Sequence, residues 1–159
     1  MTHITRRMTF RLAAVAVVAA SAVAIAAARQ SSASNPLVGA WRVTAFADAN
    51  GVIPNPQPGL YVFTRQHYSF ARIQGTRPLP DYPSNDRATD ADKVAVFNAL
   101  YLNTGTYAVT GNTLRTNAMV AKSKFAIGAG NQYDFAVSGN TLTLTQKPAG
   151  AVITLARLE

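Results

Sequence analysis

The apolar and polar residues after position 36 follow the pattern of short β-strands. Alternating or aromatic-rich runs of β-forming residues predict eight of them. They run from Leu37 to Phe46, Leu60 to Arg65, Tyr68 to Ile73, Thr106 to Thr110, Thr113 to Val120, Gln132 to Ser138, Thr141 to Lys147 and Val152 to Leu158. Gly-Asn pairs at 111–112 and 139–140 predict tight hairpin turns. The chain is therefore expected to be mainly β, as a closed eight-stranded antiparallel up-and-down barrel, because closure removes exposed edges.

Two loops and one short helix interrupt the predicted strands. Residues 53–58 read Ile-Pro-Asn-Pro-Gln-Pro and predict an extended loop, since proline has no N–H to donate within a sheet. Residues 74–89 predict a second long loop, of the kind that is usually functional or mobile. Thr89 can cap a helix together with Asp92. We expect that helix to end near residues 103–105, with Val94, Phe97 and Tyr101 on one face.

The first part of the chain has the composition of an export signal. Arg6, Arg7 and Arg11 precede an apolar run over residues 12–28 that ends in three alanines. A basic start, an apolar stretch and small residues at its end are typical of a secretory signal peptide. The alternative is an uncleaved membrane anchor, for which a run of about 17 residues is near the lower limit.

Cleavage after Ala28 or Ala33 would release the mature protein. We therefore expect residues 1–33 to be a signal peptide and the start of a linker, and residues 34–159 to be the barrel domain. The product is expected to be exported, either periplasmic or secreted, with no stable membrane span after processing. Oligomeric state is left open by the sequence.

Charge and composition exclude several classes of function. The formal net charge of +8 falls to +4 when four arginines leave with the signal peptide, which leaves 11 basic and 7 acidic residues. The remaining basic residues are scattered, so no nucleic-acid partner is expected. There is no cysteine, and His67 is the one histidine of the mature part. We therefore predict no cofactor, no metal site and no catalytic residue.

The order of several short motifs resembles the bacterial lipocalin-like domain family. The motifs are Leu37-Val-Gly-Ala-Trp-Arg-Val43, Gly59-Leu-Tyr-Val-Phe-Thr64 followed by Tyr68-Ser-Phe70, Gly105-Thr-Tyr-Ala-Val-Thr-Gly-Asn112 and Phe135-Ala-Val-Ser-Gly-Asn-Thr-Leu-Thr-Leu144. The resemblance implies a calycin-type barrel that binds a small, largely apolar molecule. It also implies a structural pair, in which Trp41 closes the barrel base and Arg157 packs across it through a cation–π contact.

Aromatic residues on the predicted strands are the candidate ligand-binding residues. Because side chains alternate along a strand, each set faces one side of the sheet, where it can either fill the barrel or line a ligand cavity. Two arginines can face inward to meet an anionic head group, or can be solvated. The candidate set is Tyr61, Phe63, Tyr68, Phe70, Arg72, Tyr107, Arg115 and Phe135.

Three classes of function remain open. The first is an exported protein that binds a small hydrophobic or amphipathic ligand inside the barrel. The second is an enzyme of the isomerase or cyclase type, in which Tyr68, Arg72 or Arg115 converge on a substrate carbonyl. The third is a structural or interaction module of the cell envelope. The first is the function that we expect.

Overall fold

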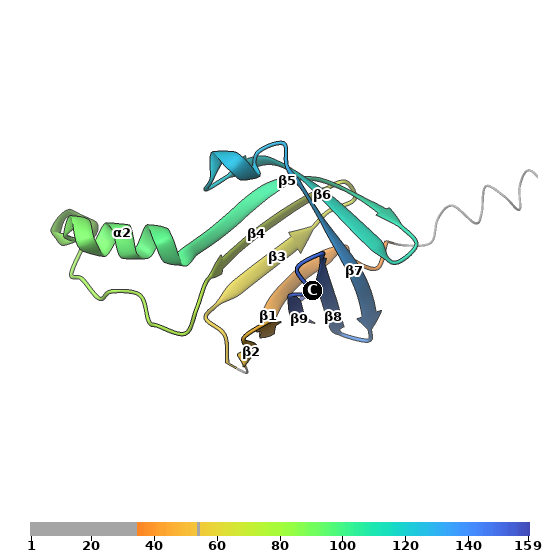
Figure 1. Ribbon diagram of the computed structural model, residues 1–159, viewed down its shortest axis with the longest axis horizontal. Helices are drawn as coiled ribbons and strands as arrows, with labels where there is room; N and C mark the ends of the chain where they lie inside the picture. Colours follow the sequence, from red (N-terminus) through yellow and green to blue (C-terminus); the bar gives the residue numbers. More distant parts are fainter. Residues whose placement is uncertain (1–34, 54) are drawn as a thin grey trace, which may run out of the picture. The chain divides into compact units, whose positions relative to one another are not determined.

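The computed structural model of the chain describes residues 35–53 and 55–159, and residues 36–159 form one compact unit (Figure 1). The predicted signal peptide, residues 1–33, lies outside the described residues. In chain order the elements are β1 (Gly39–Asp48), β2 (Gly51–Ile53), β3 (Gly59–Phe63), β4 (His67–Ile73), the 3₁₀ turn η1 (Asn85–Arg87), α2 (Asp90–Ala99), β5 (Leu100–Thr110), β6 (Thr113–Ala121), the 3₁₀ turn η2 (Lys124–Ala126), β7 (Gly130–Ser138), β8 (Thr141–Lys147) and β9 (Val152–Arg157).

Eight of these strands form a closed antiparallel barrel. Neighbours along the sheet follow the order β1-β3-β4-β5-β6-β7-β8-β9, and β1 also pairs with β9, so the sheet closes on itself. The predicted eight-stranded up-and-down barrel is therefore confirmed. Its two ends differ. The base is the end where Trp41 pairs with Arg157, and the mouth is the end where Ala47 pairs with Val152.

The base is closed by Trp41 and Arg157. The Trp41 side chain is fully buried, and its Nε1 donates a hydrogen bond of 2.7 Å to the carbonyl oxygen of Leu37. The Arg157 guanidinium lies 4.0 Å from the Trp41 ring centroid. Its two terminal nitrogens donate to the carbonyl oxygens of Val38 and Pro36, each at 2.9 Å. Arg157 thus ties the segment before β1 to the end of β9.

The structure differs from the sequence-based prediction at β2. Residues 51–53, the last of which we expected to begin a loop, pair with Phe46–Asp48 and extend the sheet beyond the barrel. Gly51 has a φ of +122°, which glycine adopts without a side-chain clash. The Asn50 N–H also donates to the Asp48 side chain at 2.8 Å. The chain can therefore reverse within two residues and reach the free edge of β1.

The helix is shorter than predicted. The capping box is present, because the Thr89 side chain accepts from the Asp92 N–H while the Asp92 side chain accepts from the Thr89 N–H. The helix then ends at Ala99 instead of near residues 103–105. Residues 100–104 instead pair with residues 69–73 of β4, so the sheet satisfies their backbone groups. No residue of α2 is buried, and the helix extends from the barrel at the mouth (Figure 1).

Candidate functional site

Four of the predicted ligand-binding residues lie inside the barrel as part of its core. Tyr61, Phe63, Tyr68 and Phe70 are each 5% exposed or less. The Tyr61 and Phe70 rings stack with centroids 4.8 Å apart, and Tyr68 stacks on Phe70 at 6.3 Å. They belong to one hydrophobic cluster that also contains Trp41. These aromatic side chains therefore fill the barrel interior and support the site without lining either pocket described below.

Two more predicted residues, Tyr107 and Phe135, pack against this cluster while remaining partly exposed. The Tyr107 ring meets Phe63 edge to face at 5.4 Å, and its hydroxyl donates to the carbonyl oxygen of Thr64 at 2.6 Å. Neither residue lines the two pockets. Both therefore act in packing.

Arg72 is the predicted residue that reaches the mouth. It follows Tyr68 and Phe70 at two-residue spacing on β4, so it faces the same side as they do. Its guanidinium carbon lies 4.8 Å from the Phe46 ring centroid and 5.0 Å from that of Tyr101. Arg72 is partly buried, and its Nε has no hydrogen-bond partner. Within residues 35–53 and 55–159, no carboxylate forms an ion pair with it.

A pocket of about 300 Å³ opens beside Arg72 at the mouth. Its wall comes from the end of β1, from β2 and from the end of β4. The lining residues are Phe46, Asp48, Ile53, Pro56, Arg72, Ile73, Gln74 and Gly75. The volume is at the small end of the range of ligand sites. The mouth therefore offers one cation, one carboxylate and an apolar wall within a single concave site.

A larger pocket of about 600 Å³ lies where β1 and β3 separate. The pairing of β1 with β3 ends at Arg42 and Leu60, which leaves a gap that Pro56 and Pro58 flank. Gly59 is required there, because a Cβ would come within 2.7 Å of Val43 Cγ2 and 2.8 Å of Arg72 Cβ. Pro56, Arg72 and Ile73 line both pockets, so the two adjoin.

Several polar groups are buried in the barrel interior. Asn103 is 1% exposed, and neither its Nδ2 nor its Oδ1 has a hydrogen-bond partner. Burial raises the pKa of Tyr61 to about 12, although the nearby Arg72 opposes the increase. Burial likewise raises the pKa of Tyr133 and that of Tyr68. The tyrosines are therefore neutral hydrogen-bonding groups at physiological pH.

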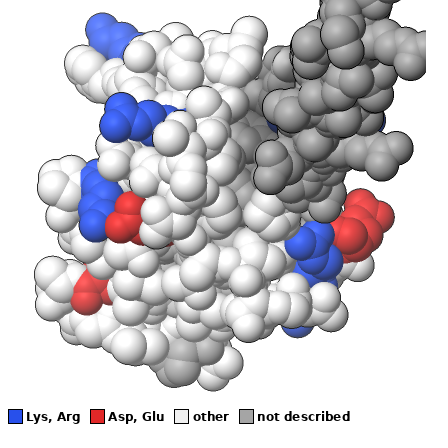
Figure 2. Space-filling model, turned by 90° about the vertical axis from the view of Figure 1, so that its right-hand side faces the viewer, with Lys and Arg blue, Asp and Glu red and all other residues white. Residues whose placement is uncertain are grey.

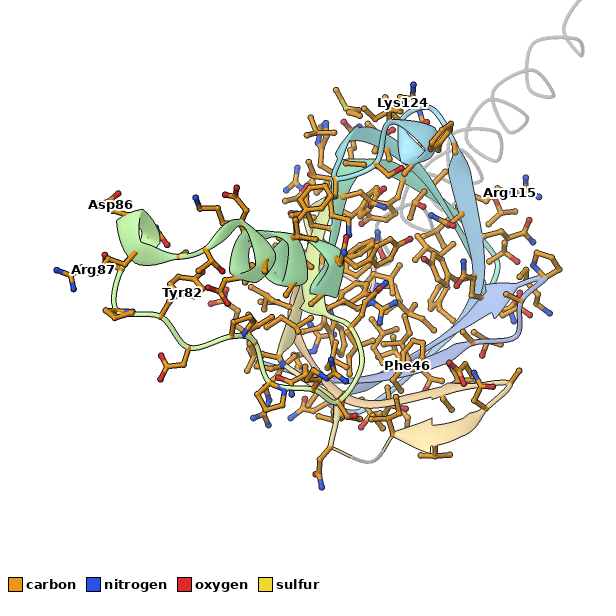
Figure 3. All side chains as sticks on the ribbon, turned by 60° about the vertical axis from the view of Figure 1, so that its left-hand side comes forward. Phe46, Tyr82, Asp86, Arg87, Arg115 and Lys124 are labelled. Atoms are coloured by element: carbon orange, nitrogen blue, oxygen red, sulfur yellow. The ribbon has the colours of Figure 1, made fainter. Side chains whose placement is uncertain are left out.

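Arg115 does not join the other candidates. Its neighbours Leu114 and Thr116 are buried while Arg115 is exposed, which places it on the outer face of β6. Figure 3 shows its side chain pointing away from the barrel on the side opposite α2. Arg115 therefore does not converge with Tyr68 and Arg72, which share the inward face of β4.

Sequence reasoning missed three residues of the site: Phe46, Tyr101 and Asn103. The sequence correctly places Phe46 in a strand. A β-bulge between Val43 and Ala45 determines which side of the sheet Phe46 faces, and no sequence signal predicts that bulge. Tyr101 and Asn103 were assigned to the helix. The β-forming residues around Tyr101 could have predicted a strand there, but the helical spacing of Tyr101 from Val94 and Phe97 favoured a helix.

Other kinds of site receive no support within the described part of the chain. It contains no cluster of three or more metal-ligating side chains, and none of its helices has the length and apolar character to span a bilayer. On the face that Figure 2 shows, basic and acidic side chains are scattered, some of them side by side, and they form no large area of one charge. The mouth is therefore the site with the clearest chemistry.

Comparison with known proteins identifies similar barrels. A lipocalin-like protein from Bacteroides uniformis superposes with a TM-score of 0.49 and 14% identity, covering 78% of this chain and 100% of that chain. An uncharacterized protein from Bacteroides eggerthii gives a TM-score of 0.48 and 8% identity, covering 76% and 98%. No protein-family model and no curated protein matches the chain. At these identities and TM-scores, the likeness transfers no ligand or activity.

Proposed function

We propose that this protein binds a small amphipathic molecule at the barrel mouth, with an anionic group of the ligand at Arg72. The observation that carries the proposal is a partly buried guanidinium without a carboxylate partner beside a pocket of about 300 Å³. The Phe46 and Tyr101 rings contact this guanidinium, but no described carboxylate balances its charge, and a carboxylate ligand would do so through charge-assisted hydrogen bonds.

The rest of the mouth is suited to the apolar part of such a ligand. Phe46 and Tyr101 flank the guanidinium, so it is held between two rings and has few accessible conformations. Ile53 and Ile73 extend the apolar wall, and the adjoining pocket of about 600 Å³ continues it past Pro56. Because aromatic side chains fill the interior, the proposed ligand lies at the mouth and not at the centre of the barrel.

Asp48 makes the proposal more specific. It lines the same pocket as Arg72 without forming an ion pair with it. A ligand with one anionic group can approach Arg72 while remaining away from Asp48, whereas a dianion would be repelled by the Asp48 carboxylate. The proposed ligand class is therefore monoanionic amphiphiles.

The test compares decanoate with decanol, which share the apolar chain and differ in the head group. Isothermal titration calorimetry should give tighter binding for decanoate by about tenfold, a difference typical of one charge-assisted hydrogen-bonded contact. Arg72→Gln should remove this preference, whereas Arg115→Gln should retain it. Equal affinity for the two probes, or an unchanged preference in Arg72→Gln, would refute the assignment.

Export is part of the same proposal. It rests on the basic start of the chain and the apolar run over residues 12–28. Fractionation of the native host followed by N-terminal sequencing should find the protein outside the cytoplasm, starting after Ala28 or Ala33. A cytoplasmic protein that retains Met1 would contradict it.

A further inference from the structure

An apolar and basic surface lies at the mouth end of the barrel, away from both pockets. We call it the η2 surface. It comprises Phe97 at the end of α2, the end of β6, and the turn η2 with the residues around it. The large side chains of Phe97, Met119, Val120, Phe125 and Ile127 are each at least half exposed, and Phe125 is 83% exposed. Such a concentration of exposed apolar side chains marks an interaction site.

A β-bulge creates part of this surface. Along β6 the buried side chains are Leu114, Thr116 and Ala118, so regular alternation would bury the residue at position 120. The pairing with β5 instead shifts at this point, because Thr104 pairs with Val120 while Gly105 pairs with Ala118. Met119 is therefore the extra residue, and both it and Val120 are exposed.

Two lysines complete the η2 surface. The Lys122 ammonium donates to the carbonyl oxygens of Phe97 at 2.9 Å and Asn98 at 3.4 Å, and lies 4.9 Å from the Phe97 ring centroid. It thereby connects the end of α2 to β6. The Lys124 ammonium lies 5.4 Å from the Phe125 ring centroid and is labelled in Figure 3. Among the described carboxylates, none forms an ion pair with either lysine.

We propose that the η2 surface binds an anionic phospholipid membrane. Aromatic rings beside ammonium groups suit the membrane interface, where the rings enter the headgroup region and the lysines meet lipid phosphates. Because no described carboxylate neutralises either lysine, both add positive charge that attracts anionic lipids, although the Lys122 ammonium also donates to the end of α2. The surface lies at the barrel end that holds Arg72, since β4 ends and β5 begins there. Membrane binding itself does not depend on the proposed ligand.

The test uses the chain as its host produces it, with vesicles of phosphatidylcholine alone or mixed with phosphatidylglycerol at three to one. Co-sedimentation should show about tenfold tighter binding to the anionic vesicles. That preference should weaken strongly at about 0.5 M salt. Lys122→Gln combined with Lys124→Gln should remove most of it. Phe97→Ser combined with Phe125→Ser should reduce binding to both kinds of vesicle by about tenfold or more.

Matched controls make the same chemical changes elsewhere on the barrel. Val52 is 70% exposed on β2, and Arg115 is exposed on β6. Val52→Ser and Arg115→Gln should leave vesicle binding unchanged. Because all variants come from the same host and share the same N-terminal segment, any contribution of that segment to vesicle binding is common to every sample.

Several results would overturn the proposal. These are equal binding to neutral and anionic vesicles, equal losses in the control variants, or no vesicle binding. Analytical ultracentrifugation provides a further check. If the chain forms a dimer that dissociates in the double serine variant, the η2 surface is a contact between copies of this chain and not a membrane site.

Discussion

Replacing Asn103 by leucine should make the barrel more stable. Asn103 is 1% exposed, and both atoms of its side-chain amide lack hydrogen-bond partners. A buried polar group without a partner costs about 1–3 kcal/mol. Leucine has the same branching at Cγ, so it replaces the two amide atoms with methyl groups and removes that cost. It also adds apolar burial among Phe70, Tyr101 and Ala121, the residues beside position 103 in the sheet.

The net effect is smaller than the relieved cost, since methyl groups are larger than amide atoms. Small neighbours limit the strain, because Gly105 and Ala121 lie on the same strand and on the adjacent one. Overpacking of about 1 kcal/mol leaves an expected gain of up to about 2 kcal/mol in the free energy of unfolding. For a domain of this length, the midpoint of thermal unfolding should then rise by up to about 8 °C.

Chemical unfolding with urea, followed by tryptophan fluorescence, measures this change, because Trp41 is the one tryptophan and is fully buried. Asn117→Leu is the matched control, since Asn117 is exposed on β6 and its replacement should change stability by less than about 0.5 kcal/mol. If Asn103→Leu instead loses more than about 1 kcal/mol, the Asn103 amide must be hydrogen-bonded in solution, and the reasoning from an unpartnered group fails.

Three further predictions follow from the described contacts. Arg157→Ala should lower the free energy of unfolding by about 2 kcal/mol in urea titrations, because it removes the contact with Trp41 and two hydrogen bonds, whereas Arg115→Ala should change it by less than about 0.5 kcal/mol. Stability should also fall between pH 10 and about 12, because Tyr61 ionises at its ordinary pKa in the unfolded chain and only near 12 in the folded one. Tyr61 contributes a decrease of about 1.4 kcal/mol per pH unit, and Tyr133, whose pKa burial also raises, adds to it; urea unfolding at each pH measures the total. Thr89→Ala should raise hydrogen exchange of the α2 amides by about fivefold while leaving global stability unchanged, because the capping box is lost but no residue of α2 is buried.

Each of these has a clear contrary outcome. Equal losses in the two arginine variants would mean that closure of the base contributes no specific stability. Stability that stays constant from pH 10 to 12 would show that Tyr61 is not held neutral by burial. A large loss of global stability in Thr89→Ala would mean that α2 contributes to the barrel through contacts other than its own capping.

The barrel could be predicted from the sequence because its evidence is local and repeated. Hairpin turns at residues 111–112 and 139–140 and the alternation along the flanking strands each indicate antiparallel pairing. The end of the helix was harder to predict from the sequence. Residues 100–104 have helical spacing relative to Val94 and Phe97, and only their pairing with β4, which is a tertiary interaction, makes them a strand.

The candidate site could be predicted only in part for a similar reason. Alternation correctly groups Tyr68, Phe70 and Arg72 on one face of β4, but it does not say whether that face fills the barrel or lines a pocket. The answer depends on how side chains from other strands pack against them. For Arg115, alternation alone determines the face. Its neighbours Leu114 and Thr116 are buried, so Arg115 lies on the outer face.

The pairing of β1 with β9 also determines when the fold can form. Trp41 and Arg157, which close the base, are separated by most of the barrel sequence, so their contact carries a large loop-closure cost. Barrels dominated by such distant pairings fold slowly. A chain emerging from the ribosome cannot complete this barrel until β9 has been synthesised. Until then the sheet stays open, and the edge of β1 that β9 later covers has no partner strand.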